Sequence, residues 1–453
     1  MGNKLDSKTQ LQRRKIEHSQ EGVASEFYWA CRTGDIELVK AMIPYIPYDQ
    51  LNQLEPNGST PLHAASFFCH ADVVRLLLHD YGVQRYYLNR HGLSAYEEAQ
   101  TEEIKQIFRR PSNRFFDVEE TIEDIFDILS VKSNEIDNNN SDSASEDDNE
   151  ENTNETPSTW IQGFRTKEEI KQEKYYYCKG KALIQSRIGR FIMRNGPKFC
   201  SHCRKNKEVM SEFISYFNDR EFRVNKLQAI VDEYVTPDHP EYNKCKELLD
   251  DYSEQESVCS LLKLYTLETE FYKKIKKSCQ AIAWSLYIIL PDLKERYYQG
   301  LSYRGLQMTE KDLQEYRWAL KNPDSLIKTK TFSSTSIERA EAEKFACTSD
   351  PNQLSVLMIF HFPQVSDMAI NLGQIEDNKL RAVSEYENEK EVLILPQTFF
   401  RVQNVEFDTE KHQYAIYLEN LALHKSSLIS ALKFMIYRDE ETKLTAYYTE
   451  NRF

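Results

Sequence analysis

An internal repeat near the N-terminus constrains the fold of this chain more than any other feature of its sequence. Ala30–Val39 aligns with Ala65–Val74 at a spacing of 35 residues, and Gly92 in a third unit, Asn89–Ala95, lies 34 residues after Gly58. A fixed period of this length predicts stacked helical units, because one unit cannot bury its apolar face alone. The last helix of the array, around Ile104 and Ile107, is short and charged, which is typical of a terminal cap.

The motif at Thr60–Ala65 resembles the ankyrin-repeat signature T-P-L-H-x-A, and it follows a turn dipeptide at Asn57–Gly58. The resemblance implies that His63 hydrogen-bonds this turn and has no catalytic role. Cys69 stands where the repeat usually has Gly, which strains the turn between the helices slightly. We predict α-helical ankyrin repeats over residues 23–110, with a protein partner as their ligand.

Composition and charge exclude several classes of protein. The net charge of −14 disfavours nonspecific binding to nucleic acid. Nine scattered cysteines do not form a disulfide framework and favour a reducing compartment. The N-terminal tail, residues 1–22, has no apolar core of a secretory signal, and the longest apolar run, Ala281–Leu290, is too short to span a bilayer and is expected to be a buried helix. We expect a cytoplasmic protein with no nucleic-acid partner and no integral membrane segment.

The first residues nearly fit a myristoylation signal at Gly2. Asp6 stands where such a signal usually has Ser or Thr, so an unmodified tail is favoured.

Residues 111–158 change in character. Asn134–Glu155 carries nine carboxylates and no basic residue, so it repels itself and has too few apolar side chains to bury a core. We predict a disordered acidic linker over 111–158; the alternative is an acidic docking segment.

Residues 159–256 have a charged, mostly helical pattern. Cys200 and Cys203 form a C-x-x-C motif, but a structural zinc site needs a second ligand pair. His239 and Cys245 do not supply one at a standard spacing, so we predict two ordinary thiols and no metal site.

Residues 257–453 change from helical to strand patterns. Helical stretches run through Leu261–Tyr287, and apolar runs bounded by turn residues then predict strands such as Leu354–Phe360 and Glu391–Leu395. Nucleotide-binding fingerprints such as G-x-G-x-x-G and the Walker A loop are absent from the sequence. The remaining candidates for chemistry are three short motifs in this region.

The first two motifs combine a cation with hydroxyl groups. Arg304 beside Gly305 in a short apolar strand suits a guanidinium that holds phosphate oxygens, with Gly305 leaving room for a ligand. In the run Phe332–Ile337, Ser334 and Ser336 are expected to point to the same side of a strand.

The third motif is an acidic pair. Glu389 and Glu391 are two residues apart, so an extended backbone would direct both carboxylates to one side and Lys390 to the other. Such a pair at the head of a buried apolar strand is costly without partners.

In this order, Arg304, then Phe332–Ser336 (FSSTS), then Glu389–Leu393 (EKEVL) resemble the R-S-ExE pattern of arginine-specific mono-ADP-ribosyltransferases. Leu264–Tyr272 resembles the helical lead-in of the animal-type enzymes, although Glu270 replaces their usual Pro. Pro396–Val402 resembles the strand that follows their catalytic Glu. The resemblance covers residues 257–420. It implies a multidomain chain in which a mixed α+β domain of two packed sheets, with an NAD cleft between them, follows the α-helical ankyrin repeats.

The resemblance also implies the site residues. NAD would be the substrate and no metal would take part. The catalytic set would be Arg304, Ser334, Glu389 and Glu391, and the NAD-binding set would be Arg304, Gly305, Ser334, Thr335, Ser336 and Glu391. Glu391 would hold the nicotinamide ribose, oriented by Ser334, while Arg304 clamps the phosphates and Glu389 receives the acceptor guanidinium.

The turn Ser384–Asn388 resembles the loop that selects the substrate in this family. Two roles stay open for its Tyr386: its ring stacks on the acceptor, or it is an ordinary surface tyrosine. Three functions stay open: transfer of ADP-ribose to arginine of a target protein, NAD hydrolysis or transfer to another acceptor, and a binding scaffold with an inactive transferase domain.

Overall fold

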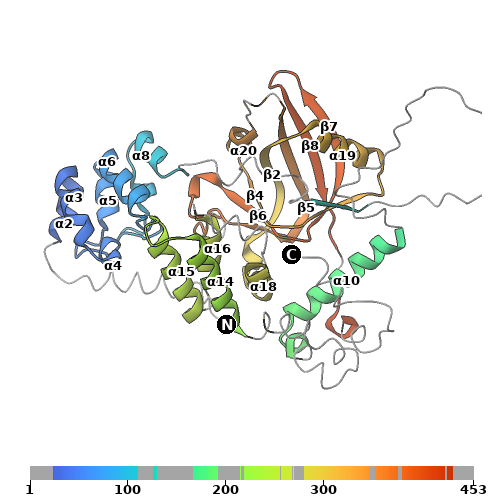
Figure 1. The fold of residues 1–453 in the computed structure, drawn as a ribbon, viewed down its shortest axis with the longest axis horizontal. Coiled ribbons are helices and arrows are strands. Elements are labelled where there is room, and N and C mark those ends of the chain that lie inside the picture. Colours follow the sequence, from blue (N-terminus) through green and yellow to red (C-terminus); the bar gives the residue numbers. More distant parts are fainter. Residues whose placement is uncertain are drawn as a thin grey trace, which may run out of the picture. The chain divides into compact units, whose positions relative to one another are not determined.

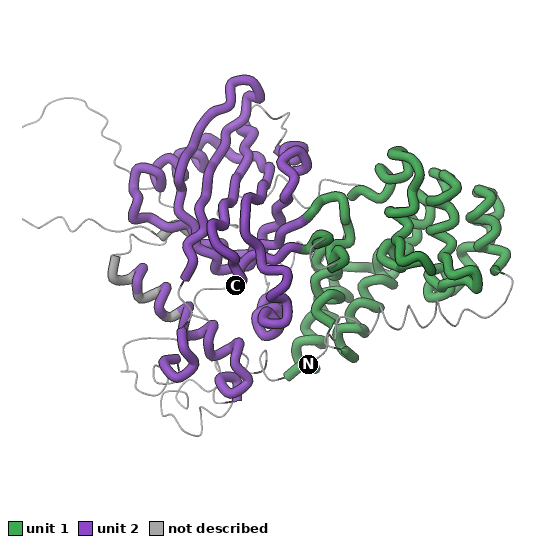
Figure 2. The backbone as a smooth tube through the Cα atoms, turned by 180° about the vertical axis from the view of Figure 1, so that it is seen from behind, with its two compact units in different colours: residues 1–115, 219–275, 372–390 green, residues 116–218, 276–371, 391–453 purple. Residues whose placement is uncertain are grey.

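The computed structural model describes residues 24–110, 126–129, 167–191, 215, 219–255, 257–267, 269, 280–346, 350, 352–375, 380–423 and 426–431. The predicted tail with Gly2, the acidic stretch Asn134–Glu155 and the Cys200–Cys203 motif lie outside these residues. The chain divides into two compact units, which Figure 2 shows in green and purple. The first unit comprises Met1–Phe115, Asp219–Ile275 and Leu372–Lys390, and the second comprises Phe116–Asn218, Lys276–Asn371 and Glu391–Phe453.

The first unit begins with short helices arranged as repeated pairs (Figure 1, blue). These elements are α2 (Glu26–Thr33), α3 (Ile36–Met42), η1 (Ile43–Tyr45), α4 (Tyr48–Leu51), α5 (Pro61–Phe67), α6 (Ala71–Arg75), η2 (Leu76–Asp80), α7 (Ala95–Glu98) and α8 (Glu102–Ile107). Capping side chains set where several begin: Thr60 Oγ1 accepts the backbone N–H of His63, and Ser94 forms a capping box with Glu97.

The turns of this array repeat as the sequence predicts. Gly58 and Gly92 occupy equivalent turns, each with φ 75°. Gly34 and Cys69 follow equivalent helices with φ 75° and 60°, so Cys69 adopts a left-handed conformation that favours Gly, and the predicted strain at this turn is confirmed.

His63 has a structural role, as predicted. Its ring lies 2.7 Å from Thr60 Oγ1 and 3.0 Å from the Leu93 carbonyl, so it ties one repeat to the next. Burial lowers the pKa of His63 to about 4, which keeps the ring neutral. The apolar positions that define the period, among them Ala30, Val39, Ala65 and Val74, are buried in one core.

Among the described residues, three further helices belong to the first unit. They are α14 (Arg220–Tyr234), α15 (Tyr242–Gln255) and α16 (Val258–Thr266). At Gly82 the repeats approach this helical part closely, because a Cβ there would lie 2.2 Å from the Pro240 carbonyl oxygen. Gln84 adds a hydrogen bond of 2.8 Å to Glu247 on α15.

The second unit is built around a mixed β-sheet (Figure 1, yellow to red). Its strands are β1 (Phe126–Leu129), β2 (Tyr297–Met308), β3 (Leu326–Thr329), β4 (Ser333–Ser336), β5 (Leu354–Asn371), β6 (Glu391–Ile394), β7 (Phe399–Asp408) and β8 (Gln413–Asn420). Its helices include α10 (Lys167–Gln185), α18 (Gln280–Ile289), η4 (Leu290–Arg296), α19 (Glu310–Lys321) and α20 (Arg339–Ala346). Most neighbouring strands are antiparallel, while β5 and β8 are parallel.

The two expected sheets form one hydrogen-bonded network with the order β1-β3-β7-β8-β5-β2-β4-β6. The reason is the length of β5, whose first half pairs with β8 while Ala369–Asn371 at its end pairs with β6. A core that includes Leu306, Met358 and Val392 lies on one face of this network. The expected order of ankyrin repeats followed by a region of helices and strands is therefore confirmed.

Several local predictions are also confirmed. The apolar run Ala281–Leu290 forms α18 and the start of η4, and its described side chains are mostly buried. The predicted strands at Leu354–Phe360 and Glu391–Leu395 are β5 and β6.

β1, in contrast, is a paired strand within residues 111–158, where the sequence predicted a linker; its backbone pairs with β3.

Within the described ranges, no helix combines the length and apolar character needed to cross a membrane.

Candidate functional site

Three neighbouring strands of the second unit bring together three of the predicted site residues. The strands β2, β4 and β6 are consecutive in the sheet and carry Arg304, Ser334 and Glu391. All three residues are buried, with 2%, 3% and 2% of their surfaces exposed. A buried cation and a buried carboxylate are stable only with polar partners, and the strands supply them.

Ser334 holds the carboxylate of Glu391. Its Oγ donates a hydrogen bond of 2.6 Å to Oε1 of Glu391, a length typical of a charge-assisted bond. In the antiparallel register Ser336 lies opposite Glu391 and Ser334 opposite Leu393, so Ser334 and Glu391 are diagonal neighbours on one face. The alternation of β4 and β6 thus places the serine hydroxyl beside the carboxylate.

Arg304 is bound to the same strand. Its Nη1 donates to the backbone carbonyl of Ser334 at 3.2 Å, so the guanidinium and the Ser334 side chain are held on either side of one backbone position. The chain of contacts from Arg304 through Ser334 to Glu391 lies wholly within the second unit.

The space beside Gly305 is filled, whereas the sequence predicted room for a ligand there. A Cβ at this position would lie 1.9 Å from the Ala342 carbonyl oxygen and 2.7 Å from the Ala346 nitrogen. The backbone of α20 therefore occupies the space beside Gly305, and the residue is needed for packing of this helix on β2.

Thr335 and Ser336 are engaged within the protein. Thr335 lies opposite Val392, on the face that carries the apolar core, and its hydroxyl donates to the Val392 carbonyl at 2.8 Å. The prediction that Thr335 binds the cofactor stays a prediction. Ser336 shares the face of Ser334, as predicted, and its Oγ accepts the backbone N–H of Glu338 at 3.0 Å.

Glu389 does not share a strand with Glu391, and this prediction is wrong. Glu389 ends the 3-10 helix η5 (Glu387–Glu389), and Lys390 adopts a left-handed conformation with φ 42° before β6 begins at Glu391. Period-2 alternation applies only to extended backbone, so it does not relate these two carboxylates. Glu389 belongs to the first compact unit and Glu391 to the second.

Glu389 instead binds an arginine that sequence reasoning missed. Arg110, which follows α8 by three residues, donates from Nε to Oε1 of Glu389 at 2.9 Å and from Nη2 to Oε2 at 3.1 Å. The two residues are 279 positions apart, and no period or motif of the sequence links them.

Tyr386 is buried, with 1% of its surface exposed, so the reading as a surface tyrosine is wrong. The guanidinium carbons of Arg110 and Arg85 lie 4.0 and 4.9 Å from the centre of its ring. The ring therefore stacks on cationic groups of the chain itself.

The segment before Glu389 is fixed by buried ion pairs within the first unit. Glu385 contacts Lys244 Nζ at 2.7 Å and Arg85 Nε at 3.5 Å, and its backbone N–H donates to Thr266 Oγ1 at 3.0 Å. Burial alone would raise the pKa of Glu385, but the charges of Lys244 and Arg85 outweigh it and lower the pKa. Arg381 adds a bidentate pair with Glu97, at 2.7 and 2.8 Å.

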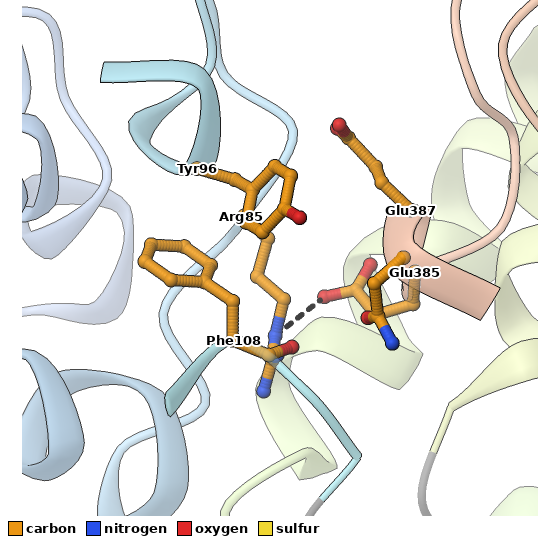
Figure 3. Close-up of a pocket in the computed structure, with 6 residues that line it drawn as sticks. Arg85, Tyr96, Phe108, Glu385 and Glu387 are labelled. Atoms are coloured by element: carbon orange, nitrogen blue, oxygen red, sulfur yellow. Dashed lines mark hydrogen bonds and ion pairs between the residues drawn. The ribbon is translucent and has the colours of Figure 1, made fainter. Parts of the chain in front are cut away.

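A small hollow lies beside this segment, lined by Arg85, Tyr96, Phe108, Glu385, Glu387 and Asn388. Figure 3 shows Arg85 reaching Glu385 across it. Burial and, to a smaller extent, the charge of Glu97 raise the pKa of Glu387 to about 7. This carboxyl therefore titrates near neutral pH.

Among the side chains that the structure describes, no three of His, Cys, Asp or Glu gather in the manner of a metal site.

Comparison with known proteins assigns the repeats. Residues 16–88 match the family model described as ankyrin repeats (3 copies). This match and the repeated helical pairs show that the N-terminal array consists of ankyrin repeats. No curated protein matches the chain.

Comparison with solved structures gives distant likenesses. The ADP-ribosyltransferase HopU1 of Pseudomonas syringae pv. tomato is 12% identical, with 43% of this chain and 87% of that chain covered and a TM-score of 0.29. The Vis toxin, an ADP-ribosyltransferase from Vibrio splendidus, is 17% identical, with coverages of 45% and 87% and a TM-score of 0.24. The type III effector XopAI from Xanthomonas axonopodis pv. citri is 19% identical, with coverages of 57% and 100% and a TM-score of 0.26. TM-scores this low establish neither a shared fold nor a shared activity.

Proposed function

We propose that this chain transfers ADP-ribose from NAD to arginine side chains of target proteins and releases nicotinamide. The observation that carries the proposal is the hydrogen bond of 2.6 Å from Ser334 Oγ to Glu391 Oε1, on a strand whose Ser334 carbonyl accepts from the buried guanidinium of Arg304. A buried carboxylate oriented by a hydroxyl, with a buried cation bound to the same strand, has the composition needed to bind a sugar phosphate and stabilise a cationic sugar.

The reaction breaks the N-glycosidic bond between nicotinamide and ribose. Nicotinamide leaves as a neutral molecule, so no general acid is required, and the ribose passes through a state resembling an oxocarbenium ion. A fixed negative charge next to the ribose stabilises that state. Glu391 takes this role, and Ser334 keeps its carboxylate in one orientation.

Arg304 binds the phosphate groups of NAD. A guanidinium can bind phosphate oxygens through two parallel hydrogen bonds. Its contact with the Ser334 carbonyl couples its position to that of Ser334, so phosphate binding and orientation of Glu391 depend on the same strand.

Glu389 binds the guanidinium of the acceptor arginine. Its carboxylate binds the guanidinium of Arg110 with two hydrogen bonds, which supports its suitability for an arginine side chain. An acceptor arginine is protonated at neutral pH because its pKa exceeds 12, so it needs a base before it can attack the ribose. We propose that Glu389 receives this proton and that the ankyrin repeats bind a protein.

NAD hydrolysis is the second candidate. The same contact of Glu389 with Arg110 favours it, because an acceptor carboxylate that already holds a guanidinium leaves water as the more accessible nucleophile.

Incubation with NAD labelled in the adenosine part and with agmatine, a small guanidine, separates these functions. Labelled agmatine together with free nicotinamide supports transfer, and nicotinamide without labelled agmatine supports hydrolysis. If neither product forms, the chain is an inactive scaffold and the proposal fails.

A further inference from the structure

The guanidinium of Arg110 is buried and bound on several sides, unlike that of an ordinary surface arginine. Its Nε and Nη2 bind the two oxygens of Glu389, its Nη1 donates to the Thr266 carbonyl at 3.3 Å, and its guanidinium carbon lies 4.0 Å from the centre of the Tyr386 ring. The Arg110 side chain is 3% exposed and that of Glu389 is 13% exposed. The two carboxylate oxygens, the carbonyl and the aromatic ring together match the planar, delocalised shape of a guanidinium.

Every one of these contacts lies within the first compact unit, although the residues come from distant parts of the chain. Arg110 comes from the end of the ankyrin repeats, Thr266 ends α16, and Tyr386 and Glu389 flank the short helix η5 at its two ends. A purely structural bridge could be made by lysine as a point charge. The planar stacking and the bidentate pair require arginine.

We propose that Arg110 is an internal competitor that occupies the acceptor-guanidinium subsite formed by Glu389, Tyr386 and the Thr266 carbonyl. The proposal rests on the proposed function, since it takes Glu389 as the acceptor carboxylate. An external arginine and Arg110 require the same two carboxylate oxygens, so both cannot bind at once. Through Arg110, the ankyrin repeats thereby reduce transfer of ADP-ribose to an external arginine.

Competition of this kind has a defined kinetic signature. The tethered guanidinium raises the KM for an acceptor and leaves kcat at saturating acceptor unchanged, because enough acceptor displaces it. The size of the effect is set by how much of the time Arg110 occupies the subsite. Couplings of about 5- to 150-fold are ordinary for such devices.

The test compares full-length wild type with Arg110→Gln, which removes the charge and the fork. Arg109→Gln is the matched control, because the neighbouring Arg109 lies beside Glu102 at 3.7 Å and not in the subsite. Labelled agmatine is measured as a function of agmatine concentration at saturating NAD. We expect the KM for agmatine to fall at least about fivefold in Arg110→Gln and to stay unchanged in Arg109→Gln.

Loss of folding is separated from loss of competition in two ways. Thermal unfolding of each variant identifies one that no longer folds. Arg110→Lys keeps the positive charge in place but cannot form the fork, and we expect its KM to lie between those of wild type and Arg110→Gln.

The outcomes discriminate between the two proposals. An unchanged or higher KM for agmatine in folded Arg110→Gln and Arg110→Lys, with transfer still active, overturns the competitor and leaves the transferase standing. Absence of labelled agmatine in wild type and in both variants overturns both. Transfer that appears only when Arg110 is replaced supports both.

Discussion

The Oγ of Ser334 on β4 donates a hydrogen bond of 2.6 Å to Oε1 of Glu391 on β6. Both side chains are buried, and the antiparallel register of β4 and β6 places them on one face. A carboxylate held in this way keeps its position before the substrate arrives, which is what electrostatic stabilisation of a developing cation requires.

Replacing Ser334 with Ala should slow cleavage of NAD. A hydrogen bond to a charged group contributes about 1.5–3 kcal/mol, so kcat/KM for nicotinamide release should fall about 10- to 150-fold. Ser333→Ala is the matched control, because Ser333 is an equally buried serine that lies on the opposite face of the same strand. Equal losses in the two variants would show that Ser334 supports the strand and has no specific effect on Glu391.

Loss of Glu385 should destabilise the first unit. In Glu385→Gln, Lys244 and Arg85 lose the carboxylate that they share. Lys244 keeps Glu241 at 2.8 Å, so the cost should be at most about 3–5 kcal/mol, the cost of breaking a buried pair. Glu37→Gln, which removes the partner of an exposed Lys40, should cost at most about 1 kcal/mol. Thermal unfolding of the two variants measures the difference; similar midpoints would mean that the cluster around Glu385 contributes little to stability.

The local features of the repeats could be predicted because neighbouring residues determine them. The 35-residue period and the turn at Gly58 depend on contacts within a few residues, and the structure has both. The strands that carry Arg304 and Ser334 were predictable for the same reason, since β-branched, aromatic and apolar runs bounded by turn residues favour extended backbone.

The partners of the buried charges could not be predicted. Arg110 and Glu389 are 279 positions apart, and Lys244 and Glu385 are 141 apart, so only the tertiary fold brings them together. The prediction that Glu389 and Glu391 lie on one side of a strand was wrong for a different reason. Alternation assumes extended backbone, and the left-handed Lys390 interrupts it with no glycine or proline to indicate the break.

The stability of the first unit should depend on pH through Glu387, whose pKa burial raises to about 7. A carboxyl with a raised pKa in the folded state favours folding fully only below its ordinary pKa of 4.5, and this contribution is lost as the pH rises through 7. Glu387→Gln cannot ionise. It should therefore gain on the order of 1–3 kcal/mol over wild type between pH 5 and pH 8, a range that allows for partial exposure of the carboxyl.

Unfolding free energies of the two proteins at pH 5 and pH 8 measure this gain. If the difference between Glu387→Gln and wild type is the same at both pH values, the carboxyl titrates in its ordinary range and the hollow beside it does not disfavour its charge.

Glu391 should drive cleavage of NAD, while Glu389 should serve only the acceptor. One reaction with labelled NAD and agmatine tests it by measuring labelled agmatine and free nicotinamide for Glu391→Gln and Glu389→Gln. Glu391→Gln should retain NAD binding but lose about 10²- to 10³-fold in both products, the usual loss when one group that stabilises transition-state charge is removed. Glu389→Gln should lose labelled agmatine and keep nicotinamide release. Turnover close to that of wild type in Glu391→Gln would contradict the account.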